Sequence, residues 1–337
     1  MRVLVTGGTG FVGSHTAAEL AREGCEVRLL VRDPAKAARV FAPHGIPLAD
    51  FVVGDVTDAP SVARALEGCD AVVHAAALVA LESHRAGEVQ RINVEGAEIV
   101  LGEARRRGLS SIVYVSSSAA LFRAGGPPIG PDSEVAEASS PYARSKAAAE
   151  RFARALLEEG APVRISYPGG VVGPDDPGLS EMNHTLRVLV RDFVALTSSG
   201  LNVVDVRDLA RVHAALALGR TPPGRYVVGG PFLAWREVAD LLDALTGRRV
   251  RRLPLPGALL RAAGRAGDVA KRFVSFDFPL NHEAMTFATR WPGADSTKTL
   301  EAVGLRFRDP AESLGDALRW LVRAGHLSPE LAGRLGR

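Results

Sequence analysis

Cysteine is scarce in this sequence, since the 337 residues contain only Cys25 and Cys69. Two cysteines cannot build a disulfide framework, and there is no CxxC pair or Cys/His cluster to hold a metal ion. A long apolar run is missing as well, because no window of about 18 residues is free of charge. The strand-like opening, Met1–Val5, leaves no room for a signal peptide. We therefore expect a cytoplasmic protein with two reduced cysteines and no metal site, for which membrane contact is not expected.

A strong excess of one charge is also absent. Lysine and arginine total 41 against 38 acidic residues, and a net charge of +3 gives no indication of a nucleic-acid partner. Apolar residues make up 47% of the chain, which is enough for a sizeable core.

Short apolar runs alternate with helical patterns over the first 170 residues. The runs include RVLVTG, EVRLLVR, DFVVGDV, AVVHAAA, SSIVYVSSS and PVRISYP. Apolar strands that are separated by helices indicate a parallel sheet covered on both faces. The sequence therefore predicts an α/β fold, a doubly wound parallel Rossmann sheet with helices on both faces.

The alternation weakens after Pro174, where we expect an apolar helix over 186–196, a strand at LNVVDV and a helix over 206–218. We assign residues 1–165 to a cofactor-binding Rossmann domain, to which residues 202–230 return. Residues 166–201 and 231–337 form a smaller, mainly helical C-terminal lobe that binds the substrate over the carboxyl edge of the sheet.

The stretch TGGTGFVG, residues 6–13, follows the first strand and opens a helix. It satisfies both GxGxxG and GxxGxxG, with Gly10 and Gly13 shared by the two patterns. Glycine is needed where the turn requires a positive φ, where backbone approaches a pyrophosphate and where helix packs on strand. The stretch predicts dinucleotide binding at a helix N-terminus.

The end of the second strand discriminates between the two nicotinamide cofactors. An NAD site has an acidic residue about 20 positions beyond the glycines, whereas Val31 and Arg32 stand there, followed by Asp33. The guanidinium of Arg32 suits a 2′-phosphate, so NADP(H) is preferred. NAD(H) remains possible if Asp33 accepts from the ribose hydroxyl instead.

Tyr142 and Lys146 lie four residues apart at the start of a predicted helix. That spacing places both side chains on one face, so that the ammonium can lower the pKa of the phenol and reach a nicotinamide ribose. Ser116, Ser117 and Ser118 end the strand upstream, where a hydroxyl can hold a carbonyl oxygen beside the tyrosine. The set predicts proton transfer at a carbonyl or alcohol group.

In these motifs the sequence resembles an extended short-chain dehydrogenase/reductase, and most closely the dihydroflavonol reductase-like members, whose V-R-x-x-V-R-D-P strand end recurs at 27–34. The matching segments are TGGTGFVG, GDVTD, VVHAAA, RINVEGA, VSSSAALF, YARSK, YPGGVVGP and NVVDVRDLARVHAAL. The resemblance implies a catalytic set of Ser118, Tyr142 and Lys146, supported by Asn93.

The resemblance also implies the residues that contact the cofactor. They are Gly7, Thr9, Gly10, Phe11, Val12, Gly13, Arg32, Asp55, Val56, Ala75, Ala76, Ala77, Tyr142, Lys146, Tyr167, Pro168, Gly169 and Val171. A homodimer through helices over 88–107 and 142–157 is a further implication.

One segment departs from the pattern of the sugar-nucleotide epimerases in the family. They have an asparagine that binds the diphosphate where this chain has Ser166–Gly170, which weakens a nucleotide-sugar substrate. Asn183 or Arg187 is a possible substitute. The remaining histidines, His74 included, have no ligand spacing, and we interpret the basic segment 253–273 as a solvated helix face rather than a lipid or acyl contact.

These observations favour an NADP(H)-dependent oxidoreductase that interconverts a carbonyl and a secondary alcohol in a small-molecule substrate. An epimerase or dehydratase with tightly bound NAD is the alternative, because it would use the same three residues. A non-catalytic NADP-binding redox regulator is a third possibility, which the intact serine, tyrosine and lysine disfavour.

Overall fold

The protein is seen in a computed structural model that describes residues 1–46, 50–79, 85–137, 141–270 and 281–336. Seven parallel strands form the main sheet in the order β10-β6-β5-β4-β1-β2-β3. The strands are β1 (Arg2–Thr6), β2 (Glu26–Val31), β3 (Asp50–Val53), β4 (Ala71–His74), β5 (Ser111–Val115), β6 (Val163–Pro168) and β10 (Gly224–Val228). The order reverses between β1 and β4, which confirms the doubly wound fold and places the ligand crevice at their carboxyl ends.

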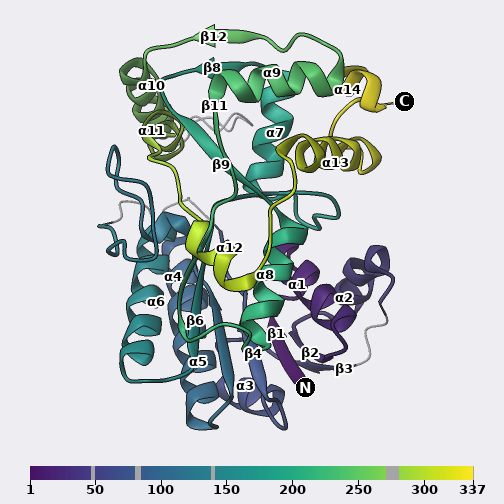
Figure 1. Cartoon of the computed structure of the whole chain (residues 1–337), viewed down its shortest axis with the longest axis vertical. Helices are drawn as coiled ribbons and strands as arrows, with labels where there is room; N and C mark the ends of the chain where they lie inside the picture. Colours follow the sequence, from purple (N-terminus) through teal and green to yellow (C-terminus); the bar gives the residue numbers. More distant parts are fainter. Residues whose placement is uncertain (47–49, 80–84, 138–140, 271–280, 337) are drawn as a thin grey trace.

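Helices cover both faces of this sheet, as predicted (Figure 1). One face carries α1 (Phe11–Arg22), α2 (Pro34–Phe41) and α8 (Val206–Ala217). The other carries α3 (Ala59–Ala65), α4 (Ala86–Gln90), a π-helical turn (Arg91–Glu95), α5 (Gly96–Arg106) and α6 (Pro141–Glu158). Alternation along β1 explains the two layers, because Val3 and Val5 pack toward α1 while Leu4 packs toward α5.

The C-terminal lobe lies over the carboxyl edge of the sheet (Figure 1). Its helices are α7 (Glu181–Arg191), α9 (Trp235–Thr246), α10 (Gly257–Ala270), α11 (His282–Arg290), α13 (Pro310–Arg323) and α14 (Pro329–Ala332), whereas α12 (Thr297–Val303) packs against α8 and β10 of the main sheet. Its strands are β7 (Gly170–Val172), β8 (Val194–Leu196), β9 (Gly200–Asp205), β11 (Phe232–Ala234) and β12 (Arg252–Pro254). Short 3-10 turns occur at Ala42–His44, Ser118–Ala120 and Gly333–Gly336.

The lobe contains more strand than the sequence indicated. β7, β9 and β11 form one small sheet, and β8 and β12 form another. The expected helix over 186–196 is wrong in its bounds, because the helix is Glu181–Arg191 and residues Val194–Leu196 pair with Arg252–Pro254 as a strand. The chain returns to the main sheet through α8 and β10.

No helix in the described ranges combines the length and apolar content needed to cross a bilayer. The basic segment 253–273 includes α10, which exposes Leu259 and Val269. Its residues 271–273 lie outside the described residues.

Candidate active site

The glycine loop joins β1 to α1 and carries almost no side-chain bulk. Gly7 has a φ of +72°, and a Cβ on it would lie 2.6 Å from the backbone nitrogen of Ala76. Gly10 directly precedes α1, and a Cβ on Gly13 would lie 2.2 Å from the carbonyl oxygen of Gly7. Three chain segments therefore meet here as bare backbone at a helix N-terminus, which fits the pyrophosphate of a dinucleotide.

The strand next to the loop is held by a buried hydrogen bond. Thr6 Oγ1 and His74 Nδ1 lie 2.8 Å apart, and the backbone nitrogen of Ala76 donates to the same hydroxyl at 3.4 Å. Burial lowers the pKa of His74 to about 3, so its ring is neutral. His74 is thus a packed, hydrogen-bonded residue, and Ala75, Ala76 and Ala77 follow it beside the glycines.

Arg32 and Asp33 have different surroundings at the end of β2. Asp33 caps α2, because its Oδ1 accepts from the backbone nitrogens of Ala35 at 2.9 Å and Lys36 at 3.1 Å. The Arg32 side chain is 74% exposed and lies 3.9 Å from Oδ2 of Asp55. Val56, one residue on, packs in the core against Gly96 rather than facing solvent.

Tyr142 lies in the first turn of α6, facing the serines that follow β5. Burial raises the pKa of its phenol well above the usual range, the carboxylates of Glu181 and Glu283 add to this, and a hydrogen bond from the Ser117 hydroxyl acts against it. Ser118 is buried and begins the 3-10 turn. Ser117 therefore lies beside the phenol, and the catalytic role of Ser118, which the resemblance implies, stays a prediction.

Lys146 is buried one turn after Tyr142. Its Nζ donates to the carbonyl oxygen of Val115 at 3.0 Å and lies 5.5 Å from the centre of the Tyr114 ring. Burial lowers its pKa to about 8, while Glu150 partly opposes the shift. The ammonium is thus mostly charged at neutral pH and is directed at the end of β5.

Asn93 connects the loop after β4 to α6. Its side chain accepts from the backbone nitrogen of Leu78 at 2.7 Å and donates to the carbonyl oxygen of Leu78 at 3.0 Å and to Ser145 Oγ at 2.9 Å. Ser145 in turn donates to the carbonyl oxygen of Tyr142 at 2.7 Å. Asn93 therefore acts as a positioning residue for the turn that carries Tyr142.

The other predicted contacts lie near the end of β6. Tyr167 is fully buried, and its hydroxyl donates to Oε1 of Glu150 at 2.5 Å, so its side chain points into the core. Pro168 ends the strand, Gly169 packs against the backbone of Gly229, and Val171 lies in β7. Only the backbone of Tyr167 remains for a ligand.

The side chain of Asn183 forms hydrogen bonds within the protein. Its amide bonds to the backbone of Gly173 and to Asp176 at 3.0 Å, and its side chain is fully buried. These bonds fix the loop before α7. Arg187 lies one turn further along that helix.

A cavity of about 520 Å³ opens beside the first turn of α6. It is lined by Ala119, Phe122, Arg123, Ala124, Glu137, Ala143, His282, Glu283, Thr286 and Phe287. Phe122 stacks on Phe287 with ring centres 4.1 Å apart, and on Trp291 at 5.6 Å. Most of these residues come from the turn after β5 and from α11, which are far apart in the chain, so no local sequence pattern predicted the cavity.

Among the described residues, no group of three or more metal-ligating side chains occurs. The site that the structure does assemble contains a phenol, a serine hydroxyl and a lysine beside a dinucleotide cradle and a cavity. A phenol with a serine and a lysine nearby can transfer a proton to or from an oxygen atom of a bound ligand.

Comparison with known proteins agrees with this geometry. The NAD dependent epimerase/dehydratase family matches residues 3–229. The chain is 29% identical to a putative dihydroflavonol 4-reductase of Synechocystis sp. over 97% of this chain and 96% of the relative. It is 27% identical to cinnamoyl-CoA reductase 1 of Oryza sativa subsp. japonica over 96% and 91% of the two chains.

A solved structure shares the architecture over nearly the whole length. The crystal structure of gox2253 superposes with a TM-score of 0.80 at 28% identity, covering 97% of this chain and 99% of that chain. The chain is therefore an extended short-chain dehydrogenase/reductase and belongs to the NAD-dependent epimerase/dehydratase family.

Proposed function

We propose that the protein is an NADP(H)-dependent oxidoreductase that interconverts a carbonyl and a secondary alcohol. The observation that carries this proposal is the hydrogen bond between Ser117 and the Tyr142 phenol, in the helical turn whose next residue, Ala143, borders the cavity. The phenol keeps its proton at neutral pH and has the hydroxyl of Ser117 as a neighbour.

Each residue has a role in this proposal. Tyr142 gives the proton to the substrate oxygen or takes it back, and Ser117 donates a hydrogen bond to the same oxygen. Lys146 supplies a positive charge behind the tyrosine, which favours the phenolate that forms transiently. A nicotinamide held by the glycine loop supplies or accepts the hydride.

The preference for NADP(H) over NAD(H) is part of the proposal. Two observations at the end of β2 support this preference. Asp33 caps α2 by accepting from the backbone nitrogens of Ala35 and Lys36, and the Arg32 side chain is exposed, with the carboxylate of Asp55 at 3.9 Å. The two backbone hydrogen bonds to Oδ1 orient the Asp33 carboxylate toward the N-terminus of α2. An exposed guanidinium such as that of Arg32 suits a phosphate.

Substitution of Tyr142 tests the activity. After a panel of ketones and aldehydes has identified a substrate, Tyr142→Phe should lower kcat by about 100-fold or more, because a positioned proton donor contributes roughly 10²–10⁴-fold. NADPH binding, followed by fluorescence, should change little. Tyr226→Phe is the matched control, since its hydroxyl donates to the Pro222 carbonyl away from the site.

Two serine variants complete this test. Ser117→Ala should reduce kcat strongly and Ser118→Ala only weakly, because Ser117 is the hydroxyl that lies against the phenol. Substantial turnover by Tyr142→Phe would contradict the proposal. Purified protein that carries tightly bound NAD and is stabilised by a nucleotide sugar would favour the epimerase or dehydratase alternative.

A further inference from the structure

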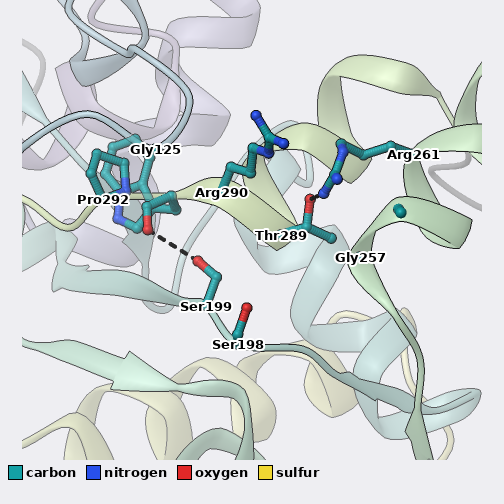
Figure 2. Close-up of a pocket in the computed structure, with 10 residues that line it drawn as sticks. Gly125, Ser198, Ser199, Gly257, Arg261, Thr289, Arg290 and Pro292 are labelled. Atoms are coloured by element: carbon teal, nitrogen blue, oxygen red, sulfur yellow. Dashed lines mark hydrogen bonds between the residues drawn. The ribbon is translucent and has the colours of Figure 1, made fainter.

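One face of α6 carries a row of ionisable side chains. They follow one another at intervals of four residues, namely Tyr142, Lys146, Glu150 and Arg154. This spacing places them on the same side of the helix. Lys146 and Glu150 are 3% and 0% exposed, whereas Arg261 and Arg290 of the C-terminal lobe line a cavity of about 390 Å³ (Figure 2). The proposed function uses Lys146 and leaves the buried carboxylate of Glu150 without a role.

Glu150 is held in place by two neighbours. Its Oε1 accepts hydrogen bonds from the Tyr167 hydroxyl at 2.5 Å and from Nε of Arg154 at 2.8 Å. Arg154 also donates to the carbonyl oxygen of Ser133 at 3.0 Å and to the Tyr167 oxygen at 3.3 Å. The other carboxylate oxygen, Oε2, is buried and has no hydrogen-bond partner in the described part of the chain. A carboxylate in this position is costly to bury, and packing alone does not explain it.

The rings that pack around Lys146 and Glu150 are neutral near pH 7. Burial raises the pKa of each phenol and lowers the pKa of the imidazole, and the rings are those of Tyr114 on β5, Tyr142 on α6, Tyr167 on β6 and His74 on β4. Glu181 on α7 and Glu283 on α11 add negative charge beside the Tyr142 phenol, one turn before Lys146. Among the described residues, Glu150 supplies the carboxylate that raises the pKa of Lys146.

The order of charges along α6 gives Glu150 a larger effect on Lys146 than Arg154 has. At 1.5 Å per residue, Glu150 lies about 6 Å along the helix axis from Lys146, and Arg154 about 12 Å. Coulomb energy falls with distance and with contact to solvent, and the Arg154 side chain is 13% exposed. Attraction by Glu150 therefore exceeds repulsion by Arg154. It opposes the burial that lowers the pKa of Lys146 to about 8.

We infer that Glu150 is a positioning residue that keeps Lys146 charged at neutral pH. The inference rests on the proposed function for the use of that charge during turnover. The effect of Glu150 on Lys146 itself is a property of the protein without substrate.

Titration of Lys146 by NMR tests this effect without turnover. The chain has four lysines, so protein labelled with ¹³C-lysine gives few side-chain signals, and the signal lost in Lys146→Arg identifies Lys146. Glu150→Gln keeps an oxygen for Tyr167 and Arg154 but removes the negative charge. Because that charge favours the ammonium, Lys146 should titrate about one pH unit lower in Glu150→Gln than in the wild type, a tenfold change in its proton affinity.

Tyr167→Phe is the matched control. It removes a hydrogen bond to Glu150 but leaves the carboxylate paired with Arg154, so Lys146 should titrate as in the wild type. Glu150→Asp restores the charge and should return the midpoint toward the wild-type value. The double variant Glu150→Met/Arg154→Met replaces the whole ion pair by apolar side chains, a change that buried sites often tolerate. Its Lys146 should also titrate below the wild type, because the nearer charge is lost.

The pH dependence of turnover connects this charge to the proposed activity. Once a substrate is known, the alkaline limb of kcat/KM should move to lower pH by about one unit in Glu150→Gln and should stay in place in Tyr167→Phe. An unchanged NMR midpoint of Lys146 in both Glu150→Gln and the double variant would overturn the inference. A lowered midpoint with an unmoved pH profile would support the inference and contradict the role of Lys146 in the proposed function.

Discussion

At the residue scale, hydrogen-bonding partners decide which side chains remain for ligands. Three polar side chains near the predicted sites form hydrogen bonds to groups of the same chain, namely those of Asp33, Asn183 and Tyr167. Asp33 precedes a proline at the first helical position, and this cap signature is visible in the sequence. The hydrogen-bond partners of Asn183 and Tyr167 cannot be read from the sequence, because they are known only from the folded structure.

The first prediction concerns the role of Arg32 in the choice between NADPH and NADH. Arg32→Ala should weaken NADPH binding by about 10- to 150-fold, which corresponds to loss of a charge-assisted contact of roughly 1.5–3 kcal/mol, less whatever solvent exposure removes. NADH binding should be nearly unchanged. Dissociation constants at low salt measure both effects.

Arg39→Ala is the matched control for that experiment, because Arg39 is exposed in the last turn of α2 and carries the same charge. Equal binding of the two cofactors by the wild type, or a preference for NADH that persists in Arg32→Ala, would contradict an NADP(H) enzyme.

At the scale of elements, the β1–α1 unit depends on close packing of backbone. A methyl group at position 13 would lie 2.2 Å from a carbonyl oxygen of the preceding loop, and neither backbone can retreat without moving the strand or the helix. Gly13→Ala should therefore destabilise the protein by about 1–3 kcal/mol, the usual cost of overpacking, and should also weaken dinucleotide binding.

Gly102→Ala is the control, since Gly102 is also helical and the nearest atom to its Cβ would be 4.0 Å away, on Phe152. It should leave stability unchanged or raise it by up to about 1 kcal/mol. Urea unfolding of both variants measures the difference, and equal midpoints would show that the close approach at Gly13 has no energetic consequence.

At the scale of the whole molecule, two lobes enclose the site, and the sheet edge and α11 contribute opposite walls. The stacked rings of Phe122 and Phe287 join the lobes across this site. Backbone pairing between Ile129 and Ala294 adds a second connection. A substrate bound in this cavity would therefore contact both lobes at once.

The oligomeric state stays a prediction. α5 and α6 pack side by side, and the outward face of α6 exposes Arg144, Arg151 and Ala155. The large exposed apolar side chains in the described ranges lie on other elements. A dimer through this face would therefore join small and charged side chains.

Light scattering at micromolar concentration should give twice the chain mass of 35.6 kDa. Ala155→Glu should shift the protein toward the monomer, because it places a charge on the exposed face of α6 that the proposed dimer would bury. Ala244→Glu, on an exposed position of α9, should not. A wild-type mass of one chain would exclude the homodimer.

The sequence by itself determined the features that depend on local spacing. Strand alternation specified the parallel sheet, the glycines specified the cradle, and four-residue spacing placed Tyr142 and Lys146 on one helix face, because these patterns follow from backbone geometry. Tertiary structure alone decided that Ser117 lies beside the phenol, that Val194–Leu196 pairs as a strand, and that Arg261 and Arg290 line one cavity. These features depend on contacts between residues distant in the chain, and their distances are set only when the two lobes pack.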